Sequence, residues 1–164
     1  MKPKASLEFI SSDNKFGLKV EKKEVSKILK ICRSAGKKEV GGILVGTYDE
    51  THQFALVKDI SGAPSDSKQS RSSFYRGIQG LQNLLNKFWA KQQYFYLGEW
   101  HFHPYASSDA SLCDIEQMKA IAVSENYNCP EPILIICGGK VDEEWDMAAY
   151  VFPRNQEWIK LDGV

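Results

Sequence analysis

Apolar and polar residues follow two different periods along this chain, which predicts a mixture of strands and helices. Alternation over residues 5–10 and 15–20 indicates two short strands, separated by the turn-forming residues 11–14. Apolar residues at helical spacing over 22–34 predict a first helix, and Gly36 follows where such a helix is expected to stop. The chain therefore opens with two strands and a helix.

The remaining segments continue this mixture to the end of the chain. We expect, in order, a strand, its hairpin partner, a loop, a helix, a strand, a helix and three strands at 40–48, 53–60, 61–73, 78–88, 94–103, 111–125, 132–139, 144–152 and 157–161. No internal repeat or composition change marks a domain boundary. The pattern predicts one α+β domain over residues 1–164, with a single mixed, largely antiparallel sheet flanked by helices.

Composition and charge narrow the classes of function. Hydrophobic residues make up 43% of the 164 residues and charged residues 26%, as in ordinary globular proteins. Lys and Arg together number 21, as do Asp and Glu, and this zero net charge argues against a nucleic-acid partner. No apolar run approaches the roughly 20 residues that a membrane-spanning helix needs, and no apolar core of a signal peptide is present. We expect a cytoplasmic protein with reduced cysteines and no membrane partner.

The stretch GEWHFHPYASSDASLCD at 98–114 holds two of the chain's three histidines. Because strand side chains alternate, His101 and His103 are expected to project from the same face, with Trp100 and Phe102 directed into the core. Two imidazoles on one strand face can bind a single metal ion, although an H-x-H pair by itself is a weak signal.

Ser111 and Asp114 lie three residues apart at the start of a predicted helix. The simple interpretation is a helix cap, because S-x-x-D before an apolar run satisfies free backbone N–H groups. Alternatively, Asp114 supplies a third metal ligand beside the two histidines, and water takes the fourth position of a catalytic zinc site. Both roles are compatible.

The whole spacing is H-x-H-P, with seven residues (Pro104 to Ala110) between His103 and Ser111, and then S-x-x-D. It resembles the signature of the JAMM (MPN-plus, or JAB) zinc peptidases. This resemblance implies an MPN (JAB) fold across nearly the whole chain. It also implies Zn²⁺ as cofactor, with His101, His103 and Asp114 as its ligands. Many relatives have proline where this chain has Ala110, a difference that affects the stiffness of the loop and removes no ligand.

The same resemblance implies a catalytic glutamate just before a glycine-containing apolar strand, and Glu39 opens EVGGILVG in that position. Glu39 would act as general base, and the Ser111 hydroxyl would stabilise the oxyanion of the tetrahedral intermediate. The plain alternative for Glu39 is an exposed strand-end residue. Gly41 and Gly42 would allow another group to approach the backbone closely beside the general base, or they would allow tight packing of the strand.

Three other residues, Glu99, Cys113 and His52, are interpreted separately from the predicted ligands and the general base. Glu99 shares strand parity with the two histidines, so it either orients one of them or lies exposed at the rim. Cys113 is interpreted as a small buried apolar residue, and His52 as a surface residue.

The sequences GEWHFHP and RSSF (71–74) are similar to those of bacterial JAB domains. This resemblance implies an isopeptidase that acts on a conjugated protein. The preferred substrate is a cyclase of a CBASS antiviral operon, or a ubiquitin-like protein, joined through a flexible C-terminal tail. The alternatives are a peptidase that processes ubiquitin-like sulfur carriers and, in a different class, a zinc-free MPN scaffold. We expect the tail to bind by strand addition, with the loop Ser61–Ser73 ordering over it.

Overall fold

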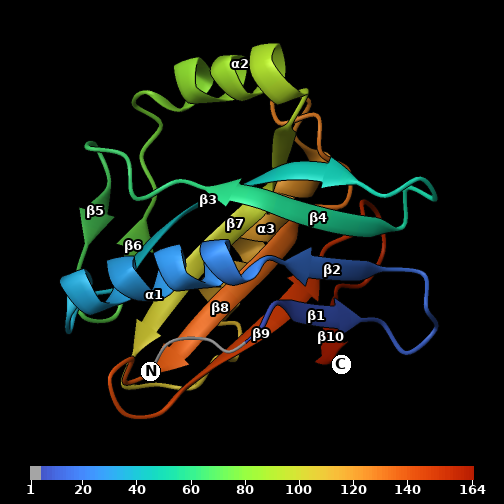
Figure 1. Ribbon diagram of the computed structural model, residues 1–164. Coiled ribbons are helices and arrows are strands. Elements are labelled where there is room, and N and C mark those ends of the chain that lie inside the picture. Colours follow the sequence, from blue (N-terminus) through green and yellow to red (C-terminus); the bar gives the residue numbers. More distant parts are fainter. Residues whose placement is uncertain (1–4) are drawn as a thin grey trace.

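The computed structural model describes residues 5–164, so the first four residues of the predicted domain lie outside the described part. Figure 1 shows its elements, which are β1 (Leu7–Ile10), β2 (Gly17–Val20), α1 (Lys22–Ala35), β3 (Val40–Tyr48), β4 (Phe54–Ile60), β5 (Lys68–Gln69), β6 (Phe74–Tyr75), α2 (Leu81–Gln92), β7 (Phe95–Pro104), α3 (Leu112–Val123), β8 (Ile133–Gly139), β9 (Trp145–Val151) and β10 (Ile159–Gly163). None of the helices over residues 5–164 has the length and apolar composition needed to cross a membrane.

The main sheet closes on itself, in the strand order β1-β10-β9-β8-β7-β3-β4-β2. Only the pairs β7–β8 and β2–β4 are parallel among these neighbours. This confirms the predicted α+β class and the mixed, largely antiparallel sheet. Closure was not predicted; it arises because β1 pairs with β2 on one side and with β10 on the other.

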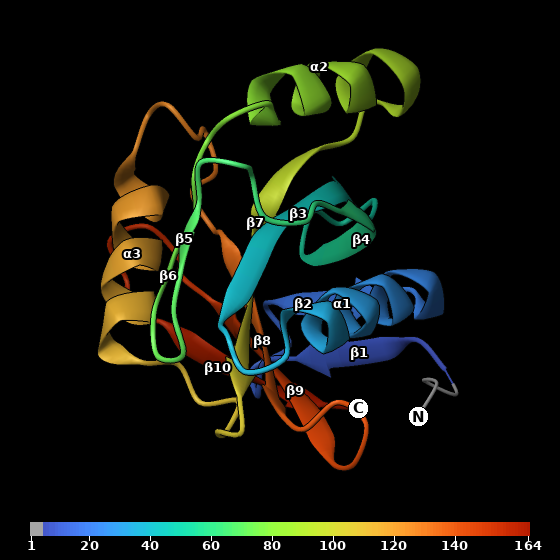
Figure 2. The same cartoon turned by 90° about the vertical axis from the view of Figure 1, so that its left-hand side faces the viewer.

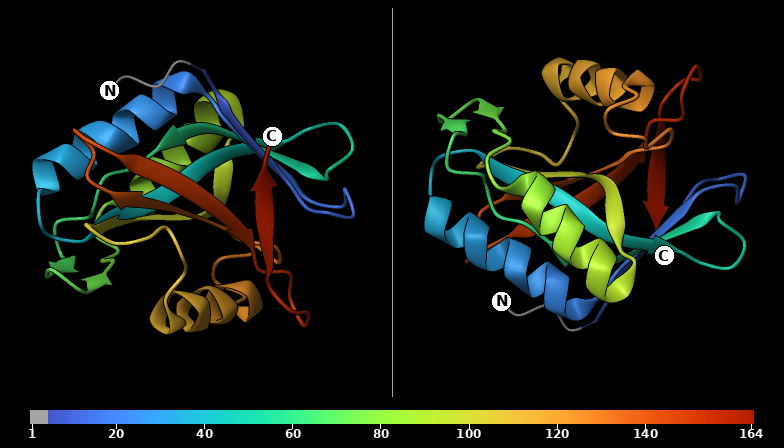
Figure 3. Two further views of the ribbon diagram at one scale, coloured as in Figure 1. Left: turned by 90° about the horizontal axis from the view of Figure 1, so that it is seen from below. Right: turned by 90° about the horizontal axis from the view of Figure 1, so that it is seen from above.

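Helices cover both faces of the sheet. Figures 2 and 3 show α1 and α3 on opposite sides, with α2 beyond the end of the sheet where β7 begins. The α1 side packs Ile28 and Leu29 with Trp100 in one apolar core. On the other side, Met118 of α3 packs with the outward-facing residues of β7 and β8 in a second core. The second face is the one that carries His101 and His103.

Most predicted elements agree with the structure to within about two residues, and two segments differ. The predicted loop at 61–73 contains β5, which pairs with β6 in a separate two-stranded sheet. The second helix begins at Leu81, so Ile78 lies outside it. The reason is local, because the backbone N–H groups of Ile78 and Gln79 donate to the carboxylate of Asp66 and hold this stretch as a loop.

Candidate active site

Strand β7 presents its histidines as the alternation predicts. His101 and His103 are buried, at 3% and 8% exposure, on the face toward α3. Trp100 and Phe102 belong to the core on the α1 side. The β7 backbone pairs with β3 and β8 on its two sides, so both imidazoles project from the interior of the sheet and not from a free edge.

The start of α3 forms a complete capping box. The Ser111 hydroxyl accepts a hydrogen bond from the Asp114 N–H at 3.1 Å, and the Asp114 carboxylate accepts one from the Ser111 N–H at 2.8 Å. The Ser111 oxygen uses a lone pair in this bond, so its hydrogen stays available to donate. Ser111 is exposed, whereas Asp114 is buried. The predicted cap is therefore present and leaves the hydroxyl free for a second role.

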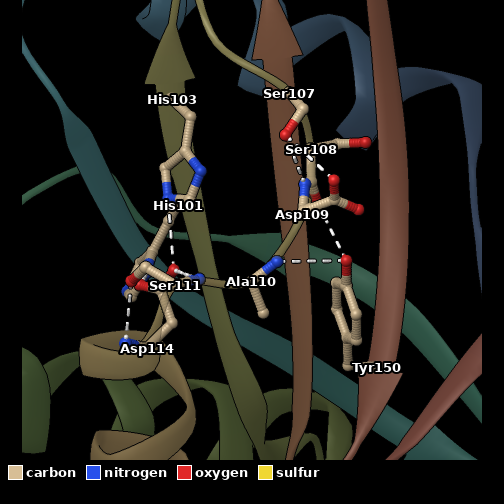
Figure 4. A network of polar contacts seen from close by, with 9 residues as sticks. All are labelled: His101, His103, Ser107, Ser108, Asp109, Ala110, Ser111, Asp114 and Tyr150. Carbon is tan, nitrogen blue, oxygen red and sulfur yellow. Dashed lines mark hydrogen bonds and ion pairs between the residues drawn. The ribbon is translucent and has the colours of Figure 1, made fainter.

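The two histidines and Asp114 meet between β7 and α3 (Figure 4). Nδ1 of His101 lies 2.8 Å from one carboxylate oxygen of Asp114, and Nε2 of His103 lies 3.2 Å from the other. Burial would raise the pKa of Asp114, but the hydrogen bonds of both imidazoles hold this pKa well below its usual range. Burial would lower the pKa of His103, but Asp114 and the charge of Glu39 raise it overall.

The sequence predicts a zinc site formed by these three side chains. Within residues 5–164 no three His, Cys, Asp or Glu side chains are arranged around a common ion position, because these three bond one another directly. However, Nε2 of His101 is a buried atom without a hydrogen-bond partner among the described residues. Two neutral imidazoles and one carboxylate are the protein ligands of many catalytic zinc sites. The residues therefore fit zinc, with an imidazole nitrogen available as donor.

Glu39 lies beside this cluster. The β3–β7 register pairs Val40 with Phe102, so the preceding Glu39 lies opposite His103 and on the same face. Its carboxyl is half-buried, and burial raises its pKa. The charges of His103 and His101 oppose this increase in pKa, whereas that of Asp114 adds to it. Glu39 is therefore not a freely exposed strand end, and its carboxyl lies within the electrostatic field of the cluster.

The two glycines after Glu39 have different surroundings. A Cβ at Gly41 would lie 2.8 Å from Cδ2 of His101 and 2.8 Å from the ring of Phe74, which packs edge-on against the imidazole. A Cβ at Gly42 would instead lie 2.2 Å from the carbonyl oxygen of Ser61. The closest atom to a Cβ at Gly41 would be the Trp100 carbonyl oxygen at 2.3 Å, so Gly41 serves both the tight pairing with β7 and the space for the imidazole. Gly42 serves the packing of the loop after β4.

Glu99 is fully buried, so its interpretation as an exposed rim residue is wrong. It accepts hydrogen bonds from Arg76 at 2.9 Å and from the Tyr96 hydroxyl at 3.1 Å. Burial raises the pKa of Glu99, and the Arg76 guanidinium opposes that increase. Sequence reasoning missed Arg76, which lies just after β6 outside any strand, and no local pattern marked it as a partner of Glu99.

Two further expectations concern residues outside the cluster. Cys113 is exposed, which corrects its interpretation as a buried apolar residue, because it lies on the outer side of the first turn of α3. His52 is exposed, as expected.

Comparison with known proteins assigns the chain to a family. The family model for prokaryotic homologs of the JAB domain matches residues 21–150. The chain belongs to the prokaryotic JAB family. The matched range includes all five predicted site residues: Glu39, His101, His103, Ser111 and Asp114.

One curated protein and one solved structure are similar to this chain. The chain is 36% identical over 156 residues to the CD-NTase/cGAS isopeptidase of Enterobacter hormaechei subsp. hoffmannii (strain UCI 50), which covers 95% of this chain and 86% of that protein. The solution structure of a Desulfitobacterium hafniense protein superimposes with a TM-score of 0.59 at 18% identity, over 87% of this chain and 86% of the other. The second likeness concerns the fold alone.

Proposed function

We propose that this protein is a zinc-dependent isopeptidase that hydrolyses the amide bond at the C-terminus of a conjugated protein tail and so reverses the conjugation. The observation that carries the proposal is the meeting of His101 and His103 with Asp114, beside the half-buried Glu39. The 36% identity to a CD-NTase/cGAS isopeptidase favours a cyclase of that type as the conjugated protein. We place the reaction in the cytoplasm.

Each site residue has a defined part in this chemistry. His101, His103 and Asp114 would hold the zinc ion, which activates water and polarises a carbonyl group when it is bound. Glu39 takes a proton from the attacking water and delivers it to the departing amine, because a ligand histidine has no free nitrogen lone pair for this task. The Ser111 hydroxyl donates a hydrogen bond to the negative oxygen of the tetrahedral intermediate.

A protein substrate also suits the surroundings of the site. Exposed apolar side chains lie close to the motif residues in sequence, at Tyr105 after the ligand strand and at Leu112 after Ser111. The Glu39 N–H donates to the carbonyl of Ser70 at 2.8 Å, which joins the β5–β6 hairpin to the start of β3. We propose that this hairpin, which runs from the segment Ser61–Ser73 into β6, binds the extended tail by strand addition next to the general base.

Two alternative functions compete with the proposed one. A peptidase that processes ubiquitin-like sulfur carriers would have the same site and a different tail. A zinc-free MPN scaffold would need no ligand set, whereas this chain has both histidines and the aspartate in mutual contact. Comparing activity on a cyclase tail and a sulfur-carrier tail distinguishes the first alternative from the proposed function. Measuring the metal content distinguishes the second.

The proposed function predicts cleavage of a fusion between the C-terminus of a cognate cyclase and a folded reporter. Hydrolysis is expected directly after the last residue of the tail, because the tail is the part that can extend beside the site. Removal of Arg71 and Ser72 from the tip of the hairpin should raise KM for this fusion and leave zinc content unchanged. Mass spectrometry of the products and initial rates check both points.

The matched control is the same reporter joined through an unrelated unstructured peptide of equal length. If the enzyme cleaved a sulfur-carrier tail in preference to the cyclase tail, the sulfur carrier and not the cyclase would be its substrate. Equal cleavage of every unstructured peptide, together with no effect of the shortened hairpin, would indicate a general peptidase.

The oxyanion role predicts that Ser111→Ala and Ser111→Asp both lose activity. Asp caps a helix as well as Ser does, but an ionised carboxylate has no hydrogen to donate. Loss of one oxyanion donor lowers kcat by about 100- to 1,000-fold, or ~2.7–4 kcal/mol of barrier. The lost cap destabilises only Ser111→Ala, by about 1 kcal/mol. Thermal unfolding and kcat, measured on both variants, separate the two effects. Full activity of Ser111→Asp would leave Ser111 as a cap alone.

A further inference from the structure

The segment 105–110 connects the ligand strand β7 to Ser111, and a single side chain from β9 holds its backbone. The Tyr150 hydroxyl donates to the carbonyl of Ser108 at 2.9 Å and accepts from the N–H of Ala110 at 3.2 Å (Figure 4). Tyr150 is 2% exposed, so these bonds are shielded from water. One hydroxyl thus holds the chain on both sides of Asp109, immediately before Ser111.

Two other contacts fix the same segment against β8 and β9. The Ser108 hydroxyl donates to the carboxylate of Asp146 on β9. On β8, Gly138 allows the segment to pass closely, because a Cβ there would lie 2.6 Å from the Ser108 nitrogen and 2.7 Å from the Ala106 carbonyl oxygen. The middle of the segment is therefore well anchored, whereas its last residue before Ser111 depends on Tyr150.

The identity of Ala110 explains why the hydrogen bond from its N–H to the Tyr150 hydroxyl matters. Alanine restricts the backbone much less than proline does, and it retains an N–H that proline lacks. The Tyr150 hydroxyl uses that N–H to hold the turn entering α3. Without the bond, the capping box and the contacts of Asp114 with His101 and His103 still hold the first turn of α3, but the backbone that enters it at Ala110 loses its anchor.

We propose that Tyr150 is a positioning residue: it fixes the Ser111 hydroxyl relative to the β7 histidines through the backbone of Ser108 and Ala110. This role rests on the proposed function, because it acts through the oxyanion donor. Displacement of a catalytic group by about 1 Å can lower a rate by roughly 100-fold without loss of the group itself. Tyr150 thus belongs to the catalytic architecture although it lies on a strand that carries none of the predicted site residues.

The test is Tyr150→Phe, which keeps the ring and removes the hydroxyl. We expect kcat to fall by about tenfold to a hundredfold, with KM and zinc content unchanged. Amide hydrogen exchange at Ala110 should accelerate, which reports the lost anchor independently of activity. In a Ser111→Ala background the same change should have no further effect on kcat, because the group that Tyr150 positions is already absent.

Tyr48→Phe is the matched control, since it removes the hydroxyl of a half-buried tyrosine at the far end of β3. It should leave kcat and the exchange of Ala110 unchanged. An inactive wild-type enzyme would overturn the proposed function and, with it, this role. With an active wild type, full activity of Tyr150→Phe, or an equal loss of kcat in the presence and absence of the Ser111 hydroxyl, would overturn the role of Tyr150 alone.

Discussion

Glu39→Ala and Glu39→Gln are expected to retain about one zinc ion per chain and to lose nearly all cleavage of the tail conjugate. The reason is that Glu39 lies opposite His103 on the site-facing side of β3, where it moves protons without being one of the three ligands. Removal of a general acid–base group typically lowers kcat by about 100- to 10,000-fold. Elemental analysis and initial rates on the same preparations check both halves of the prediction.

Glu50→Gln is the control for Glu39→Gln, because Glu50 is exposed just beyond the other end of β3. It should change neither zinc content nor rate. If Glu39→Gln kept full activity, Glu39 would not be the base, and the zinc ligands would stand unaffected. If it lost zinc as well as activity, Glu39 would contribute to metal binding.

His103→Ala is expected to lose both the zinc ion and the activity. Two protein ligands remain in that variant, fewer than the three that catalytic zinc sites use. Its thermal stability should also become insensitive to added zinc, because an ion that binds the folded state stabilises it only if the site exists. Elemental analysis after dialysis, together with unfolding curves with and without zinc, measures the effect independently of any substrate.

His52→Ala is the matched control, since it removes the chain's third histidine from an exposed turn. It should keep the zinc ion and the rate. A wild-type protein that is active without any metal would contradict the zinc mechanism, and stoichiometric zinc in His103→Ala would show that the ligands lie elsewhere.

The order of elements and the family were predictable from sequence because both depend on local patterns. Alternation along GEWHFHP directs His101 and His103 to one face, and S-x-x-D before an apolar run is typical of a helix start. The resemblance to JAB proteins is confirmed by the family match over 21–150. The roles of the five site residues remain predictions, although the structure brings the two histidines and Asp114 into contact.

Other features depended on contacts between distant segments. Glu99 and Arg76 are 23 residues apart, and nothing local indicates that a glutamate at the parity of the histidines is fully buried with an arginine from the loop after β6. Strand alternation assigns a side chain to a face, but it does not say what covers that face. The same limit applied to Cys113, whose exposure depends on how α3 packs.

The sequence by itself determined which residues share a strand face or a helix turn, because those relations follow from the backbone geometry of a few consecutive residues. Only the tertiary structure decided which distant segments are neighbours. It set the register that places Glu39 opposite His103, the closure of the sheet between β1 and β10, and the bonds of Tyr150 to the segment before Ser111. Those pairings join segments that are 40 or more residues apart. They form only when the whole apolar surface is buried at once, so no single stretch of the chain encodes them.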